Sequence, residues 1–187
     1  MRFVLASASP RRRDLLSAAG FEFDVDPVDV DEARAPGESA REYVLRVATA
    51  KAQAGALRHL DRAVLGADTT VVLDGDLLGK PADEADAARM LRLLSGRAHE
   101  VLTAVVAARR TRMAAALETT MVWMRELTDE EIRAYVASGE PSGKAGAYAI
   151  QGLASRFVTR IDGSYPNVVG LPVARVAGLL ADVALPG

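Results

Sequence analysis

Short apolar runs alternate with amphipathic segments through the first half of the chain. Residues 3–6 and 63–67 are uninterrupted apolar runs, which are typical of buried strands. Ser39 and Glu42 have the spacing of a capping box and predict a helix that runs to about Leu60, with Leu57 facing inward. This alternation predicts an α/β fold in which helices flank a mixed sheet.

Turn and capping residues divide the rest of the chain. The Asp74-Gly75 pair predicts a hairpin, and residues 101–108 and 114–124 predict a long antiparallel pair. The glycine-rich residues 143–152 are expected to turn into a strand. Further helices are expected at Ser9-Pro10, Asp83, Thr128 and Pro172, where capping residues or helix-starting prolines stand. Nothing marks a strong domain boundary, so residues 1–187 are interpreted as one domain, with two lobes around a cleft left open.

Composition and charge narrow the function classes. Of the residues, 50% are hydrophobic and 26% are charged, which is ordinary for a globular enzyme. A net charge of -2 argues against a protein held on nucleic acid by general electrostatics, although Arg11, Arg12 and Arg13 form a local basic patch. No apolar run reaches the roughly 20 residues of a membrane helix, and the N-terminal apolar stretch is too short for a signal peptide. We therefore expect a cytoplasmic protein.

The chain offers few metal ligands other than oxygen. It has no cysteine and only two histidines, His59 and His99. A thiolate zinc site and a histidine-rich metal centre are therefore excluded. Any metal must be held by oxygen atoms, which favours Mg²⁺ or Mn²⁺. His99 is more typical of a strand-edge surface residue and is left outside the predicted site.

The segment from Ser7 to Arg12 combines features that suit an anion. A strand delivers the chain to a helix start, where unpaired backbone N–H groups and the helix dipole attract negative charge. Hydroxyl and guanidinium groups stand on the same turn, and arginine can hold phosphate oxygens with two parallel hydrogen bonds. The alternative is a capped helix with solvated arginines. It is not a Walker loop, because the required glycines and lysine are missing.

Acidic residues and lysines supply the other candidates. Asp68 directly follows the run 63–67 and is expected where that strand ends, a place that often faces the cleft of an α/β protein. Glu32 lies in an acidic segment that is equally typical of a solvated loop. Lys51 is expected on an alanine-rich helix surface, and Lys80 stands between Gly79 and Pro81. Taken singly, each of these four residues is a weak signal. For the two lysines, the reason is that most lysines are solvated surface residues.

Eight segments, in order along nearly the whole chain, resemble the Maf family of nucleoside triphosphate pyrophosphatases. No single segment would identify the family, but the eight segments in this order do so. They are LASASPRR (5–12), DE (31–32), KA (51–52), LGADT (65–69), GKP (79–81), SGRAHEVLTAV (95–105), GEPSGKAGAYAIQG (139–152) and NVVGLP (167–172). The resemblance implies an elongated mixed sheet with a central cleft, as in the inosine triphosphatase-like fold.

The resemblance also assigns roles to residues. It implies that Asp68 accepts a proton from the attacking water, and that Ser7, Arg12, Glu32, Lys51 and Lys80 line the cleft. Three family positions are linked to the choice of nucleotide. Here they are Arg11, Thr69 and Gln151, a combination that looks like the dTTP/UTP branch. The branch that acts on 7-methyl-GTP tends to carry Trp at the first position and Glu at the last.

One position departs from the family pattern. Many members of the dTTP/UTP branch have aspartate before the lysine of the Lys-Ala-Gly motif, where this chain has Gly143 before Lys144. If that aspartate organises the loop or a metal, activity or selectivity here is altered.

The resulting hypothesis is attack by water on the α-phosphorus, with pyrophosphate as the leaving group. Aspartate is a weak base towards free water, because their ordinary pKa values are about 3.9 and about 15.7. We therefore expect a divalent ion, Mg²⁺ or Mn²⁺, held by Glu32 and Asp68. The expected partner is a small nucleoside triphosphate rather than nucleic acid or a membrane, and a homodimer is left open.

Three other functions remain open on the sequence. A nucleotidyltransferase that uses a sugar phosphate needs similar residues but requires a second substrate. A non-catalytic regulator of cell division or septum formation is the alternative from another class. A pyrophosphatase of the 7-methyl-GTP type is the third.

Overall fold

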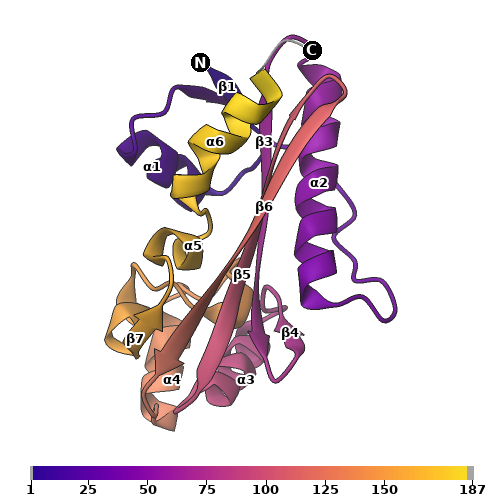
Figure 1. Cartoon of the computed structure of the whole chain (residues 1–187). Helices are drawn as coiled ribbons and strands as arrows, with labels where there is room; N and C mark the ends of the chain where they lie inside the picture. Colours follow the sequence, from indigo (N-terminus) through magenta and orange to yellow (C-terminus); the bar gives the residue numbers. More distant parts are fainter. Residues whose placement is uncertain (1, 185–187) are drawn as a thin grey trace. The chain divides into compact units, whose positions relative to one another are not determined.

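The computed structural model describes residues 2–184, which form an α/β structure (Figure 1). The strands are β1 (Phe3–Leu5), β2 (Phe23–Val25), β3 (Val64–Leu73), β4 (Asp76–Leu78), β5 (Ala98–Arg109), β6 (Arg112–Met124) and β7 (Val158–Asp162). The helices are α1 (Pro10–Ala18), α2 (Ala40–Arg58), α3 (Glu84–Leu94), α4 (Asp129–Ala137), α5 (Tyr165–Val169) and α6 (Val173–Ala184). Two short 3-10 helices are η1 (Ala145–Ala147) and η2 (Leu153–Arg156).

All of these strands belong to one seven-stranded sheet. Its order is β2-β1-β3-β5-β6-β7, and β4 pairs with β3. The strand β1 is parallel to both β2 and β3, whereas the β3–β4 and β6–β7 pairs are antiparallel. The predicted mixed α/β sheet is therefore confirmed.

The chain is organised as two compact units. The first comprises residues 1–69, 103–118 and 170–187, and the second comprises residues 70–102 and 119–169. The strands β3, β5 and β6 each contribute residues to both units. The expected single domain, elongated shape and central cleft stay predictions.

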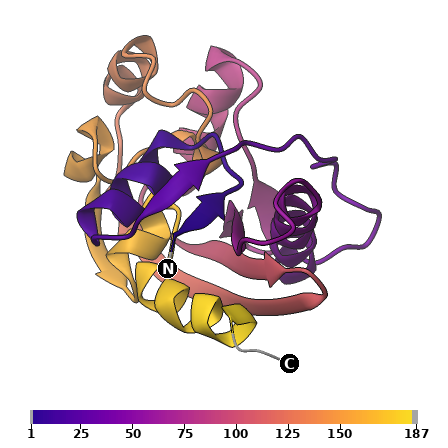
Figure 2. The same ribbon diagram turned by 90° about the horizontal axis from the view of Figure 1, so that it is seen from above.

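Alternation along the strands of the first unit separates two faces. Leu5, Leu65 and Ala67 pack with apolar residues of α1 and α6 in one buried cluster. Because successive side chains of a strand point to opposite faces, the residues between them face α2. Figures 1 and 2 show this arrangement, with α2 on one side of β3 and α1 with α6 on the other. Thr69 therefore continues the face of α1 and α6, while Asp68 continues the face of α2.

The second unit has its own core around α3 and α4, which pack against each other. Leu91 and Leu94 of α3 and Ile132 of α4 are almost completely buried. Tyr135 of α4 meets the ring of Phe157 edge-on, with 5.2 Å between ring centres. This core supports the segment between η1 and η2.

Three local predictions were wrong. Asp68 does not end a strand but lies inside β3, because the β-branched residues Thr69, Thr70 and Val71 favour continuation of the strand. Residues 143–152 contain η1 and turns, and the next strand begins only at Val158. Leu57 is 79% exposed, because α2 buries a stripe of mostly small residues instead.

Candidate active site

The site candidates of the first unit begin where β1 ends. In the parallel pair, Val4 is opposite Val64 and Leu5 is opposite Leu65, so β3 extends beyond the last residue of β1. The chain leaves β1 for α1 on one face of the sheet, whereas α2 leads into β3 on the other face. Ligands of α/β proteins bind at the carboxyl ends of strands at such a switch point. The topology therefore favours a ligand site beside residues 6–9.

The turn from β1 into α1 is held by its own hydroxyl groups. Ser9 is the N-cap of α1, and its side chain accepts a hydrogen bond from the backbone N–H of Arg12. The hydroxyl of Ser7 accepts from the N–H of Ser9 at 3.3 Å. Pro10 begins the helix, as the sequence predicts. The amino end of α1 is thus shaped to receive an anion.

Arg12 is the central cation of this turn, although it is only 8% exposed. Its guanidinium donates to the carbonyl oxygen of Gly170 at 2.8 Å, to Ser7 Oγ at 3.0 Å and to Thr69 Oγ1 at 3.1 Å. Burial lowers the pKa of Arg12, and Arg11 lowers it further, whereas Asp68 and Glu32 raise it. Arginine remains charged under these conditions, so three neutral oxygens orient a buried positive charge.

Lys51 of α2 holds two carboxylates at once. Its Nζ lies 2.6 Å from Oε1 of Glu32 and 2.8 Å from Oδ1 of Asp68. The side chains of Lys51 and Asp68 are almost completely buried, while that of Glu32 is 37% exposed. Removing one partner of a buried ion pair costs about 3–5 kcal/mol, so the three groups constrain one another. The structure therefore brings together Glu32, Lys51 and Asp68, three residues predicted for the site.

Close packing of α2 on β3 makes this contact possible. A Cβ at Gly66 would lie 2.5 Å from the carbonyl oxygen of Ala48 and 2.5 Å from the backbone N of Ala52. One at Gly55 would lie 2.6 Å from a methyl group of Val64. The backbones therefore approach where side chains are absent. This close packing places Lys51 of α2 beside β3, so that its ammonium group reaches Asp68, two residues after Gly66.

Tyr43 of α2 lies within the electrostatic influence of Glu32 and Asp68. Burial raises its pKa to about 12, and the charges of Asp68 and Glu32 contribute to the rise. The phenol therefore stays protonated at neutral pH and presents a neutral hydroxyl to this region. The Gly170 carbonyl oxygen and Thr103, whose hydroxyl lies 2.9 Å from that of Thr69, were also missed. No local sequence signal identifies these three contacts, because their partners are distant in the chain.

The remaining predicted residues are distributed over both units. Arg11 is half-buried in the first unit, and burial lowers its pKa. Lys80 and Gln151 are exposed residues of the second unit. The carbonyl oxygen of Gly79, next to Lys80, accepts a hydrogen bond from the N–H of Gly146 at 3.1 Å. Gly143 has a positive φ of 69°, which would strain any other residue here, although a Cβ at this position would meet nothing within 4 Å.

His99 forms a separate polar contact in the second unit. Its Nε2 lies 2.7 Å from the hydroxyl of Tyr148, and both side chains are buried. Burial lowers the pKa of His99 to about 4. The imidazole is therefore neutral at pH 7, and its expected exposure at a strand edge is wrong.

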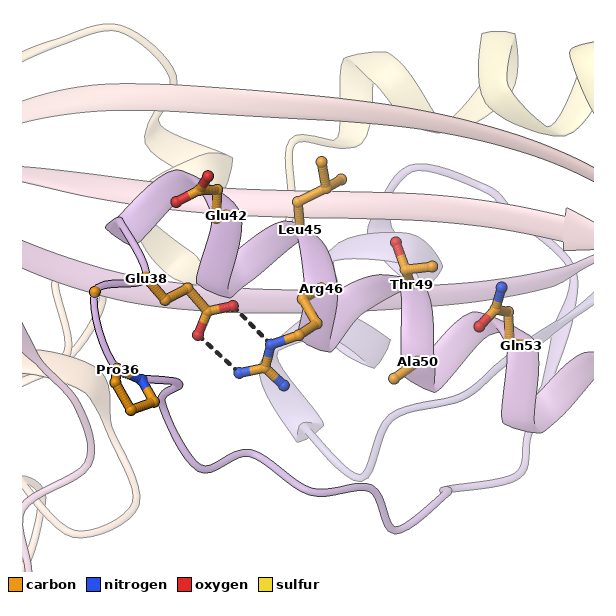
Figure 3. A pocket seen from close by; sticks show the side chains of 9 residues that line it. Pro36, Glu38, Glu42, Leu45, Arg46, Thr49, Ala50 and Gln53 are labelled. Carbon is orange, nitrogen blue, oxygen red and sulfur yellow. Dashed lines mark hydrogen bonds and ion pairs between the residues drawn. The ribbon is translucent and has the colours of Figure 1, made fainter.

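An open hollow of about 690 Å³ lies on α2 and the segment before it (Figure 3). Arg46 crosses it and donates to both carboxylate oxygens of Glu38, at 2.6 and 2.9 Å. None of the residues predicted for the site lines this hollow. Its lining consists of Pro36, Gly37, Glu38, Glu42, Leu45, Arg46, Thr49, Ala50 and Gln53. The hollow is therefore separate from the contacts of Lys51 and Arg12.

The donor set near Lys51 suits a hard divalent cation. Among residues 2–184 no group of three or more His, Cys, Asp and Glu side chains is arranged to hold a metal. However, Glu32 and Asp68 each direct one oxygen at a single positive group. Mg²⁺ is usually bound by one or two carboxylates together with water and substrate phosphates, so two carboxylates are sufficient.

Comparison with known proteins identifies relatives over nearly the whole chain. Residues 2–183 match the family described as Maf-like protein. A dTTP/UTP pyrophosphatase of Vibrio vulnificus is 52% identical over 180 residues, covering 96% of this chain and 97% of that protein. A dTTP/UTP pyrophosphatase of Geobacter sulfurreducens is 55% identical over 177 residues, covering 94% of this chain and 93% of that protein. The solved Ham1 protein of Staphylococcus aureus has a TM-score of 0.47 at 18% identity, covering 66% of this chain and 72% of that one.

Within residues 2–184, no helix combines the length and the hydrophobicity that a membrane span requires.

Proposed function

Because this chain belongs to the Maf-like protein family, we propose that it is a nucleoside triphosphate pyrophosphatase that converts dTTP and UTP to the monophosphate and pyrophosphate. The observation that carries the proposal is the contact of Lys51 with both Glu32 and Asp68, next to a strand position that contacts Arg12. Relatives at 52% and 55% identity named dTTP/UTP pyrophosphatase support the choice of substrate.

Phosphate binding falls to the turn from β1 into α1. Ser7, Arg12 and the first backbone N–H groups of α1 hold phosphate oxygens, since the guanidinium is already oriented by its contacts with neutral oxygens. Lys51 and Lys80 supply further positive charge. Phosphoryl transfer depends mainly on such positioning and on charge stabilisation.

Asp68 acts as the general base. It takes a proton from a water molecule that attacks the α-phosphorus, and the bond from that phosphorus to the bridging oxygen breaks. Pyrophosphate leaves with the electron pair of that bond. Glu32 and Asp68 would hold a divalent cation, Mg²⁺ or Mn²⁺, which when bound makes water more acidic and neutralises phosphate charge.

Base selection is assigned to Arg11, Thr69 and Gln151. The amide of Gln151 offers both hydrogen-bond donors and an acceptor, which suits a uracil or thymine edge. A carboxylate in its place would offer acceptors only. A cytoplasmic location, a homodimer and the absence of nucleic-acid binding stay predictions.

A panel of purified nucleoside triphosphates with Mg²⁺, in which pyrophosphate is resolved from orthophosphate, tests the function. We expect UTP and dTTP to yield pyrophosphate with water as the only acceptor. Release of orthophosphate and a nucleoside diphosphate would show cleavage at a different bond. A requirement for a sugar phosphate would instead identify a nucleotidyltransferase.

A further inference from the structure

Gln151 is an exposed side chain in a segment that has little regular structure of its own. The preceding Ile150 is buried, and Gly152 follows just before η2. Ala147 in η1 has a positive φ of 59°, a conformation that costs a non-glycine residue free energy. Contacts from outside this segment must therefore fix it.

Tyr135 of α4 is the first of these contacts. Its hydroxyl donates to Oε1 of Glu140 at 2.8 Å and accepts from the backbone N–H of Ala149 at 3.1 Å. The side chain is completely buried, and burial raises its pKa well above the ordinary value. The hydroxyl therefore keeps its proton and serves as donor and acceptor at once. Its backbone partner, Ala149, lies two residues before Gln151.

Glu140 is the second contact, on the other side of Gln151. Its carboxylate accepts from the N–H of Leu153 at 3.0 Å and from the N–H of Ala154 at 3.3 Å, at the amino end of η2. Burial acts to raise the pKa of Glu140, but the hydrogen bonds from Leu153, Tyr135 and Ala154 lower it below its ordinary value. The group is therefore a carboxylate at neutral pH and can accept all three bonds.

Gly152 shows how closely the two sides fit. A Cβ at this position would lie 2.3 Å from Oε2 of Glu140. Its backbone N–H donates to the carbonyl oxygen of Ala149 at 3.0 Å, which closes a tight turn around Gln151. The backbone before and after Gln151 is thus tied to one pair of side chains, the buried Tyr135 and the half-buried Glu140.

We propose that Tyr135 and Glu140 form a positioning pair that fixes the backbone on both sides of Gln151 and thereby sets the base selectivity of the enzyme. The proposal rests on the proposed function of Gln151 as the residue that reads the base. In this proposal both side chains act through the backbone, as positioning residues. Because an amide can offer donors and acceptors to several bases, discrimination depends on where its backbone is held.

The variant Tyr135→Phe tests the pair, because it removes one hydroxyl and keeps the ring against Phe157. The matched control is Ile132→Val on the same helix, which removes a methyl group from a buried side chain and removes no hydrogen-bonding group. Both variants should lower the unfolding midpoint by a similar amount. Only Tyr135→Phe should raise the KM for UTP and lower the UTP-over-CTP ratio of kcat/KM, by roughly three- to ten-fold, with kcat on UTP little changed.

Amide hydrogen exchange gives a readout that does not depend on activity. The N–H groups of Ala149, Leu153 and Ala154 should exchange faster in Tyr135→Phe than in Ile132→Val, and Glu140→Gln should have the same effect as Tyr135→Phe. Exchange rates that are equal in Tyr135→Phe and the control, or an unchanged UTP-over-CTP ratio, would overturn the proposal. A wild-type protein that releases no pyrophosphate from UTP would instead refute the proposed function, and the exchange rates would still decide whether the pair holds the segment.

Discussion

The two units hold their candidate residues by different means. In the first unit, Lys51 forms ion pairs with Glu32 and Asp68, and neutral oxygens hold the charged side chain of Arg12. In the second, the segment that carries Gln151 is held by hydrogen bonds to the buried Tyr135 and the partly exposed Glu140. Ion pairs can exchange partners when a polyphosphate arrives, whereas a fixed backbone preserves shape. In the proposed function, the general base and the phosphate-binding turn belong to the first unit, whereas base selection draws on Arg11 and Thr69 of the first unit and on Gln151 of the second.

The largest effect is expected from Asp68→Asn in the first unit. This change keeps the size of the side chain but removes its basicity and its charge on Lys51. We expect the rate of pyrophosphate release from UTP to fall by about 10²–10⁴-fold, because general-base catalysis typically contributes that much. Nucleotide binding, measured by calorimetry, should persist. A variant with a near-normal rate would show that the base is elsewhere.

The second largest effect is expected at Gly66, where the backbones of β3 and α2 are in close contact. Gly66→Ala places a Cβ against the backbone of Ala48 and Ala52, and we expect the free energy of unfolding to fall by about 1–3 kcal/mol. Gly178→Ala is the matched control, because Gly178 lies in α6 with nothing within 4 Å of the added atom. The control should be more stable by about 0.5–1 kcal/mol. Chemical denaturation measures both, and equal effects would argue against a specific contact at Gly66.

The buried histidine of the second unit predicts a dependence of stability on pH. The pKa of His99 is about 4 in the folded protein, below its ordinary value of 6.5. Between these values the unfolded chain binds a proton that the folded chain does not, so stability falls as the pH decreases. The loss is about 1.4 kcal/mol per pH unit, or about 2 kcal/mol between pH 6.5 and pH 5.

His99→Gln should remove this dependence of stability on pH while keeping a polar group near Tyr148. The difference in unfolding free energy between wild type and variant, from denaturant titrations at pH 7 and pH 5, should therefore shrink by about 2 kcal/mol at the lower pH. Carboxylates that titrate in both proteins cancel in this difference. A difference that does not change with pH would contradict a buried neutral imidazole.

The smallest effect is expected from Gln151→Glu, which changes hydrogen-bonding character without removing a charge from the first unit. We expect kcat/KM for UTP and dTTP to fall by about ten-fold, equivalent to about 1.4 kcal/mol. Gln53→Glu on α2 makes the same chemical change outside the predicted site and should leave kcat/KM unaltered. Unchanged kinetics for Gln151→Glu on both substrates would count against a base-reading role.

Local patterns predicted most elements, because their signals lie within a few residues. The cap at Ser9 and the capping box of Ser39 with Glu42 are observed where the sequence places them. The end of the strand at Asp68 was wrong, because the β-branched residues after it favour continuation of the strand. The partner that neutralises this acid inside the strand, Lys51, is distant in the sequence, and no pattern in one segment identifies it.

The candidate site shows the same division between local signals and contacts with distant residues. Motif order singled out Arg12, Glu32, Lys51 and Asp68, but it did not show that one ammonium group joins both acids. The glycine-rich residues 143–152 were expected to turn into a strand, which in the structure begins only at Val158. The actual path of residues 143–152 depends on Tyr135, on Glu140 and on left-handed residues, which only the folded chain brings into play.

The contact between α2 and Gly66 has a consequence for laboratory evolution of this protein. The separation of helix and strand is set there by main-chain atoms, so it cannot be tuned by exchanging one side chain for a slightly larger one. Libraries that seek new substrates should therefore leave the buried stripe of α2 unchanged and diversify the turns. Selection cannot bring α2 closer to β3 by a substitution at position 66, because glycine is already the smallest residue.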